Sequence, residues 1–156
     1  MTLLAQLAAL VAIVSTAIVY GADAFFALVQ RPALARVDDA TLTAVMGNVQ
    51  RVADRRMPAP GIIGIIAAAV AAVLAALAGR PTAAATAGAA FVLLAVWILL
   101  YLRISAPINR KLTAAAAAHE TPADARALQQ NWDRIIAPRA ILQGLAVLAL
   151  GLSLIS

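Results

Sequence analysis

The sequence contains no cysteine and few charged or aromatic residues. Charged residues make up 12% of the 156 residues and aromatic residues 4%, whereas about a quarter of a soluble domain is charged. The missing cysteine excludes disulfides, thiolate catalysis, zinc–sulfur sites and iron–sulfur clusters. The low charge, combined with 64% apolar residues, excludes a soluble globular domain, a disordered tail and a fibrous repeat. These features are typical of an integral membrane protein.

Metal-ligating residues are equally scarce. The single histidine, His119, stands beside Glu120 in a predicted turn, and we interpret it as a solvated loop residue. No carboxylates have the spacing of a metal site, and there is no second histidine for bis-histidine haem ligation. We therefore predict no metal site and no cofactor held by side-chain ligands.

Long apolar runs fill most of the chain. Four of them reach the length of about 20 residues that a helix needs to cross the hydrocarbon. We expect spans at about residues 3–29, 57–79, 82–102 and 135–156 of one membrane domain, residues 1–156.

The first run has one feature of a cleaved signal peptide. Ala22-Asp23-Ala24 resembles a small-residue cleavage site. No basic residue precedes the apolar run, however, and the run resumes with Phe25-Phe26. We therefore interpret it as a retained span.

Basic residues predict the orientation of the spans. The hairpin between spans two and three holds only Arg80, whereas most of the 12 Lys and Arg residues lie in the first and third loops: Arg31, Arg36, Arg51, Arg55, Arg56, Arg103, Arg110, Lys111, Arg126 and Arg134. The positive-inside rule then places both loops in the cytoplasm and both termini outside it, as in a bacterial inner membrane. Anionic headgroups account for the net charge of +5, so we expect lipid partners and no nucleic acid.

Local signals predict helices within the two long loops. Asp38-Asp39 is a plausible N-cap, and Pro58 and Pro60 should interrupt or kink the helix that follows it. Arg31-Pro32 should end span one, and Pro107 should bend or end span three. Thr121-Pro122-Ala123-Asp124 has the pattern of an N-cap followed by proline at the first helical position.

The predicted fold is therefore all-α. It is an integral membrane four-helix bundle that runs up-down-up-down, with cytoplasmic helical extensions. Spans two and three are rich in alanine, and small residues let helices approach closely in lipid. These residues are also compatible with a homo-oligomer, and the sequence does not decide between a monomer and an oligomer.

Asp23 is the most informative polar residue, because an unpaired carboxylate inside a span is costly. Arg139 is its natural partner by depth, and Arg103 is the second choice. A structural ion pair and a catalytic acid or base are both open readings. Tyr20 lies one turn before Asp23, and we name both as catalytic candidates; a packing role for Tyr20 stays open.

Further polar residues should gather at the cytoplasmic end of the bundle, where a ligand pocket is predicted. Purely structural roles are also open for these residues: they could form a basic stripe, make hydrogen bonds within the loops or anchor an aromatic ring at the membrane interface. The interface role is also open for Trp97 and Tyr101. The candidate substrate-binding residues are Asn48, Arg55, Asn109, Trp132 and Arg139.

Several short motifs resemble the anthrone-oxygenase-like family of small four-helix membrane proteins, and the resemblance covers nearly the whole chain. Span one ends in aromatic residues and a proline, a helix with an asparagine follows, and a basic residue and a tryptophan mark span four. The segments concerned are Phe25-Phe26, Arg31-Pro32-Ala33-Leu34, Asn48, Ala106-Pro107-Ile108-Asn109, Trp132 and Arg139.

The resemblance implies oxidation of a lipophilic aromatic substrate without metal or flavin. The substrate would lose a proton, and the resulting carbanion or enolate would react directly with dioxygen. By resemblance, Asn109, Trp132 and Arg139 would line the cavity. The segment before span four lacks a histidine, so no histidine base is available there.

Three functions therefore compete. The first is a cofactor-independent oxygenase. The second is a membrane bundle without enzymatic activity that binds a lipid or small ligand, or serves as a partner subunit. The third is a small transporter, which would have to dimerise because four spans are few and the halves show no repeat. A closed cavity ringed by polar residues would favour the enzyme, and a dry, fully packed bundle the structural role.

Overall fold

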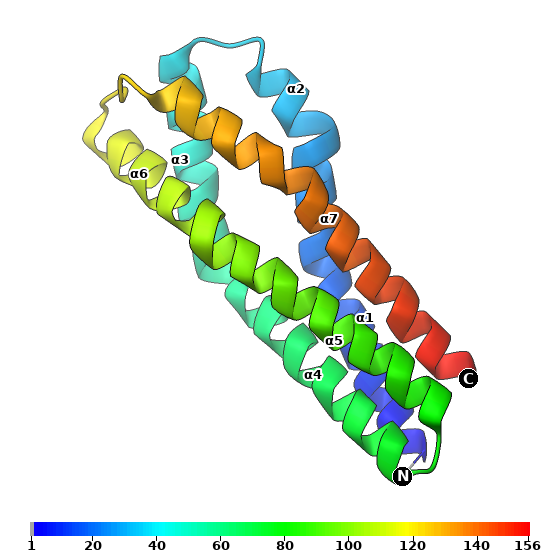
Figure 1. Ribbon diagram of the computed structural model, residues 1–156. Helices are drawn as coiled ribbons and strands as arrows, with labels where there is room; N and C mark the ends of the chain where they lie inside the picture. Colours follow the sequence, from blue (N-terminus) through cyan, green and yellow to red (C-terminus); the bar gives the residue numbers. More distant parts are fainter. Residues whose placement is uncertain (1) are drawn as a thin grey trace.

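The computed structural model describes residues 2–156, and within this range it contains helices and no strand. Figure 1 shows long, roughly antiparallel helices with both termini at one end. The helical segments are α1 (Thr2–Phe25), η1 (Phe26–Gln30), α2 (Arg31–Leu34), α3 (Asp39–Arg56), α4 (Pro58–Leu77), α5 (Pro81–Leu100), η2 (Tyr101–Ser105), α6 (Ala106–Ala118) and α7 (Ala125–Ile155).

Four stretches of these residues are long and apolar enough to cross a membrane. They are Thr2–Leu34, Pro58–Leu77, Pro81–Ala118 and Ala125–Ile155. Large apolar side chains such as Leu28 and Ile66 are exposed on the outside of the bundle, as expected of surfaces that face lipid. The predicted helical membrane bundle is therefore confirmed.

Pro32 was expected to end the first helix and Pro107 to bend or end the third span, but neither proline ends its helix. The first helix continues past Pro32 to Leu34, and the third span continues past Pro107 to Ala118. In both places a π-helical segment, η1 or η2, ends two residues before the proline. A wider π turn can keep the proline ring away from the carbonyl of the preceding turn, which is consistent with the helix continuing past the proline.

The other local signals have mixed outcomes. The side chain of Asp38 accepts the backbone N–H of Thr41 at 2.7 Å, which confirms the N-cap of α3. The break between α3 and α4 falls at Met57, directly before Pro58. The N-cap predicted at Thr121 is wrong: α7 begins at Ala125, and the backbone N–H of Ala125 bonds to the carbonyl of Pro122 in the turn before it.

The two ends of the bundle are packed with side chains of different size. Towards the termini, α1, α4, α5 and α7 pack mainly through buried alanines such as Ala12, Ala68 and Ala87. At the opposite end, which carries α3 and α6 and is here called the basic end, the core contains larger side chains, among them Met46 and Leu112. The helices can thus approach closely at the alanine-rich end, whereas the larger side chains of the basic end hold them further apart.

Candidate functional site

A cavity of about 850 Å³ lies between the two cores, and it is not closed but opens to the outside of the bundle. Its apolar walls come from several helices and include Val19, Phe26, Val49, Met57 and Ile98. Both tryptophans of the chain, Trp97 and Trp132, also line it. A concave, mostly apolar space with a few polar groups is the usual form of a small-molecule site.

One side of the cavity holds an ion-pair cluster formed by Asp23, Arg139, Trp97, Gln143 and Ser105. Nη2 of Arg139 lies 2.9 Å from Oδ2 and 3.0 Å from Oδ1 of Asp23. Gln143 and Trp97 donate to Oδ2 over 2.6 Å and 3.2 Å. Nη1 of Arg139 donates to Oγ of Ser105 at 2.7 Å. The predicted partnership of Asp23 with Arg139 is confirmed, and the pair is almost fully buried.

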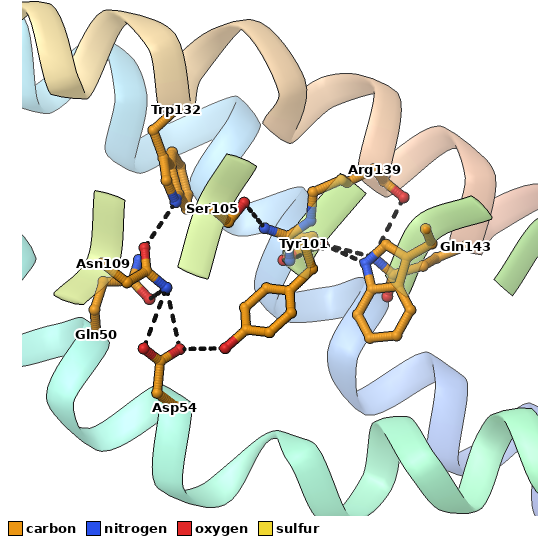
Figure 2. A network of polar contacts seen from close by, with 10 residues as sticks. Gln50, Asp54, Tyr101, Ser105, Asn109, Trp132, Arg139 and Gln143 are labelled. Carbon is orange, nitrogen blue, oxygen red and sulfur yellow. Dashed lines mark hydrogen bonds and ion pairs between the residues drawn. The ribbon is translucent and has the colours of Figure 1, made fainter. Parts of the chain in front are cut away.

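A second group, the amide cluster, lies nearer the basic end and consists of Gln50, Asp54, Tyr101, Asn109 and Trp132 (Figure 2). The Tyr101 hydroxyl donates to Oδ1 of Asp54 at 2.8 Å, and Nδ2 of Asn109 donates to the same oxygen at 3.0 Å. Asn109 also donates to Oε1 of Gln50 at 3.1 Å. Its own oxygen accepts the indole N–H of Trp132 at 3.1 Å.

Tyr101 connects the two clusters. The Arg139 guanidinium carbon lies 5.4 Å from the centre of the Tyr101 ring and 5.9 Å from that of Trp97, within the range of a cation–π contact. The face that the guanidinium presents to these rings is therefore already occupied by protein. A ligand would meet an arginine that is both paired and stacked.

The third span contributes to both clusters through a repeated four-residue spacing. Trp97, Tyr101, Ser105 and Asn109 all bond within the clusters. Because an α-helical turn takes about 3.6 residues, such a spacing drifts around the helix axis. The π-helical segment η2 covers Tyr101–Ser105 and uses more residues per turn, which offsets part of the drift. The π turn thus helps to keep these side chains on one side.

The two carboxylates of the cavity differ in their availability for chemistry. Both oxygens of Asp23 accept hydrogen bonds, and its charge is balanced by Arg139. Asp54 is partly exposed, and no basic side chain of residues 2–156 forms a salt bridge with it. Its Oδ2 has only a long contact of 3.4 Å, from Asn109. Asp54 is thus better placed than Asp23 to accept a hydrogen bond or a proton.

Most of the residues predicted for the site are brought together. Asp23, Asn48, Asn109, Trp132 and Arg139 line the cavity. Of these, Asn48 is exposed and its amide donates to the carbonyl of Ala44 at 2.8 Å on its own helix.

Two predicted residues lie elsewhere. The ring of Tyr20 packs against Gly144 and does not line the cavity. One turn of helix separates Tyr20 from Asp23, but that turn directs the two side chains differently. Arg55 is exposed and is also absent from the cavity wall, because it stands on the outer face of α3.

Sequence reasoning missed Gln50 and Asp54 altogether. They are one turn apart on α3, on the side that carries Met46 and Gly47, so the signal was a polar pair on the inward face of an otherwise arginine-rich helix. Trp97 and Tyr101 were interpreted only as interface residues. The missed signal was the four-residue spacing that continues from these two residues through Ser105 to Asn109. In a regular α-helix this spacing would drift around the axis, so it does not predict a shared face unless the π turn is known.

Within residues 2–156, no three His, Asp or Glu side chains lie close enough together to hold a metal ion. Comparison with known protein families, with curated proteins and with solved structures finds no match for this chain. The geometry of the cavity is therefore the basis for any proposal about function.

Proposed function

We propose that the protein binds a lipophilic, largely aromatic small molecule in the cavity between its two cores. The observation that carries this proposal is the cavity of about 850 Å³ itself, since ligand sites commonly measure about 300–1,000 Å³. Helix packing normally leaves few voids larger than a water molecule, so a space of this size between helices supports a ligand site over a purely structural bundle.

The aromatic walls support a flat ligand. Phe26, Trp97, Tyr101 and Trp132 all contribute to the lining. Phe26 and Trp132 already meet edge to face, with ring centres 5.2 Å apart. Aromatic rings favour such edge-to-face and offset-stacked neighbours, so a planar molecule gains more here than an aliphatic one.

Tryptophan emission tests the binding proposal directly, because both tryptophans line the cavity. We expect anthrone, added to the protein in lipid nanodiscs, to change the emission and to reach saturation. Ala53→Phe fills the cavity and should abolish the response. Ala76→Phe, an equal change at an exposed position at the end of α4, should leave it intact. A response that never saturates, or that is equal in the two variants, would show partitioning into lipid instead of binding.

Oxidation of the ligand without a cofactor is the second candidate function, and the placement of Asp54 favours it. An unpaired carboxylate beside an aromatic ligand can remove a proton from an acidic C–H bond. The carbanion would then pass electrons to dioxygen, so that one anthrone and one dioxygen give one anthraquinone and one water. Oxygen uptake with anthrone should be lost in Asp54→Asn and kept in Asp124→Asn, a matched change at an exposed aspartate outside the cavity.

For orientation, we propose that the basic end faces the cytoplasm of a bacterial cell and that both termini face away from it. Figure 1 places α3 and α6 at the end opposite the termini. α3 carries Arg51, Arg55 and Arg56, and lysine and arginine favour the cytoplasmic side. A reporter fused to Ser156 should be active only outside the cytoplasm. Activity confined to the cytoplasm would reverse the assignment.

A further inference from the structure

We infer that the cavity selects an uncharged molecule whose polar end donates a hydrogen bond to Asp54, and that it disfavours anions despite the basic character of the chain. This inference rests on the proposed binding function and names the class of ligand.

The balance of charge inside the cavity is the first argument. Asp23, Asp54 and Arg139 are the charged residues that line it. Asp23 and Arg139 neutralise each other at 2.9 Å, which leaves the negative charge of Asp54. An anion placed in a low-dielectric site beside that carboxylate would be repelled.

The arginines of α3 do not reverse this balance. Arg55 and Arg56 are exposed, Arg51 is half-buried, and all three are absent from the cavity wall. Their charges face the surroundings, where water and salt screen them. Arg110 of α6 is near enough to act on the Tyr101 hydroxyl, but it is exposed and does not line the cavity either. The net charge of +5 is thus carried mainly by residues outside the cavity wall.

Hydrogen-bonding capacity gives the second argument. The indole N–H groups of Trp97 and Trp132 already donate to Asp23 and Asn109, and the amide of Asn109 donates to Asp54 and Gln50. Nε2 of Gln50 and Nε of Arg139 have no partner, but protein atoms enclose both. The wall thus offers an anion few free donors.

Asp54, in contrast, has acceptor capacity to spare. A carboxylate provides about four lone-pair positions. Oδ1 accepts from Tyr101 and Asn109, whereas Oδ2 has only the 3.4 Å contact. The complementary group on a ligand is a hydroxyl or an N–H.

The rim of the cavity fits an uncharged molecule. Val52, Ile62 and Leu102 belong to the lining, yet 50%, 55% and 57% of their surfaces are exposed. These apolar side chains stand where the cavity meets the outside of the bundle. A ligand dissolved in the bilayer can enter past them, whereas an ion is poorly soluble there.

Three probes of similar shape test the inference: 4-octylphenol, 4-octylanisole and 4-octylbenzoate. The first donates a hydrogen bond, the second cannot, and the third is an anion. Tryptophan emission in nanodiscs reports binding, with each dissociation constant corrected for partitioning into lipid. We expect the phenol to bind about tenfold more tightly than the anisole, the effect of one hydrogen bond to a charged group. The benzoate should bind most weakly.

Asp54→Asn should reduce the preference for phenol over anisole to about twofold or less, because it removes the charge of the acceptor. The matched variant Asp124→Asn should keep it. The comparison of the three probes on the unmodified protein needs no variant, so it decides the question even if Asp54→Asn folds poorly.

The outcomes separate this inference from the binding function on which it rests. If none of the probes binds, the binding function fails as well. If phenol and anisole bind equally, or the benzoate binds best, the binding function stands and the inference is overturned. Tighter binding of 4-octylbenzylammonium than of the phenol would assign a cation to Asp54 and would also overturn it.

Discussion

Trp132 donates its indole N–H to Oδ1 of Asn109 over 3.1 Å. An indole can only donate, so this bond fixes which end of the Asn109 amide faces it. The amide nitrogen must then point to Oδ1 of Asp54 and Oε1 of Gln50, at 3.0 Å and 3.1 Å. The indole N–H on α7 thereby fixes which atoms donate and which accept in the hydrogen bonds that reach α3, here called the polarity of these contacts.

This polarity predicts the effect of exchanging acid and amide. Asn109→Asp keeps the bond from Trp132 but turns a carboxylate towards Asp54. We expect a loss of about 3 kcal/mol or more in unfolding free energy, the cost of an uncompensated buried charge. Adding Asp54→Asn restores one donor facing one carboxylate and should recover most of the loss. Denaturation in mixed detergent micelles measures both; a double variant less stable than Asn109→Asp would contradict the assigned polarity.

The Asp23–Arg139 pair predicts a second non-additive effect. Asp23→Ala strands a buried guanidinium and should cost about 3–5 kcal/mol. Asp23→Ala with Arg139→Met removes both charges and should cost less than the single change. As a control, Asp39→Ala breaks the half-buried pair with Arg126, which water still reaches, and should cost about 1 kcal/mol. A loss in the double variant equal to the sum of the losses in Asp23→Ala and Arg139→Met would mean that the ion pair is not coupled.

Gly47 predicts how closely α3 and α6 must approach. A Cβ atom at this position would collide with the carbonyl oxygen of Leu112 and the side chain of Ala116. Gly47→Ala should therefore cost about 1–3 kcal/mol through overpacking. Gly21→Ala meets nothing within 4 Å and should be neutral or stabilising by up to about 1 kcal/mol. Thermal unfolding of the two variants side by side provides the measurement.

The cap of α3 predicts a dependence on pH. The backbone N–H of Thr41 donates to the Asp38 carboxylate and holds its pKa below the usual value. A lowered folded-state pKa adds stability that is present above about pH 4 and is lost as the pH falls through the folded pKa. The hydrogen-exchange protection of the Thr41 amide should therefore fall at acidic pH. Asp38→Ser caps without titrating and should not show this change.

The spans and the helical character of the loops could be predicted from the sequence, because apolar length and capping residues act locally. The ends of the helices could not. Local rules predict a stop at Pro32 and a bend or a stop at Pro107, yet both helices continue, and a π turn precedes each proline. Such a turn depends on the packing of the whole helix and leaves no simple trace in composition.

The site shows the same division. Asp23 and Arg139 could be paired in advance, because buried charges inside a membrane need partners and few were available. Asp54 could not be distinguished from the charged surface of α3, since only the packing of α3 against α6 decides which of its polar residues faces inward. The placement of Tyr20 in the site was wrong because its ring packs against Gly144, a tertiary contact that helical spacing does not reveal.

The π turn at Tyr101–Ser105 also bears on how this chain tolerates insertions and deletions. A π turn amounts to one residue added to an α-helix. Removing one residue from it would restore regular winding and leave the residues beyond on nearly the same faces, because the wider turn absorbs the extra residue. Asn109 would then stay beside the cavity, and α6 would keep its contact face towards α3. The same deletion in the regular helix between the π turn and Asn109 would rotate Asn109 and the residues after it by about 100°. The third span therefore tolerates the loss of a residue at one place but not one turn later, although hydrophobicity is the same in both cases.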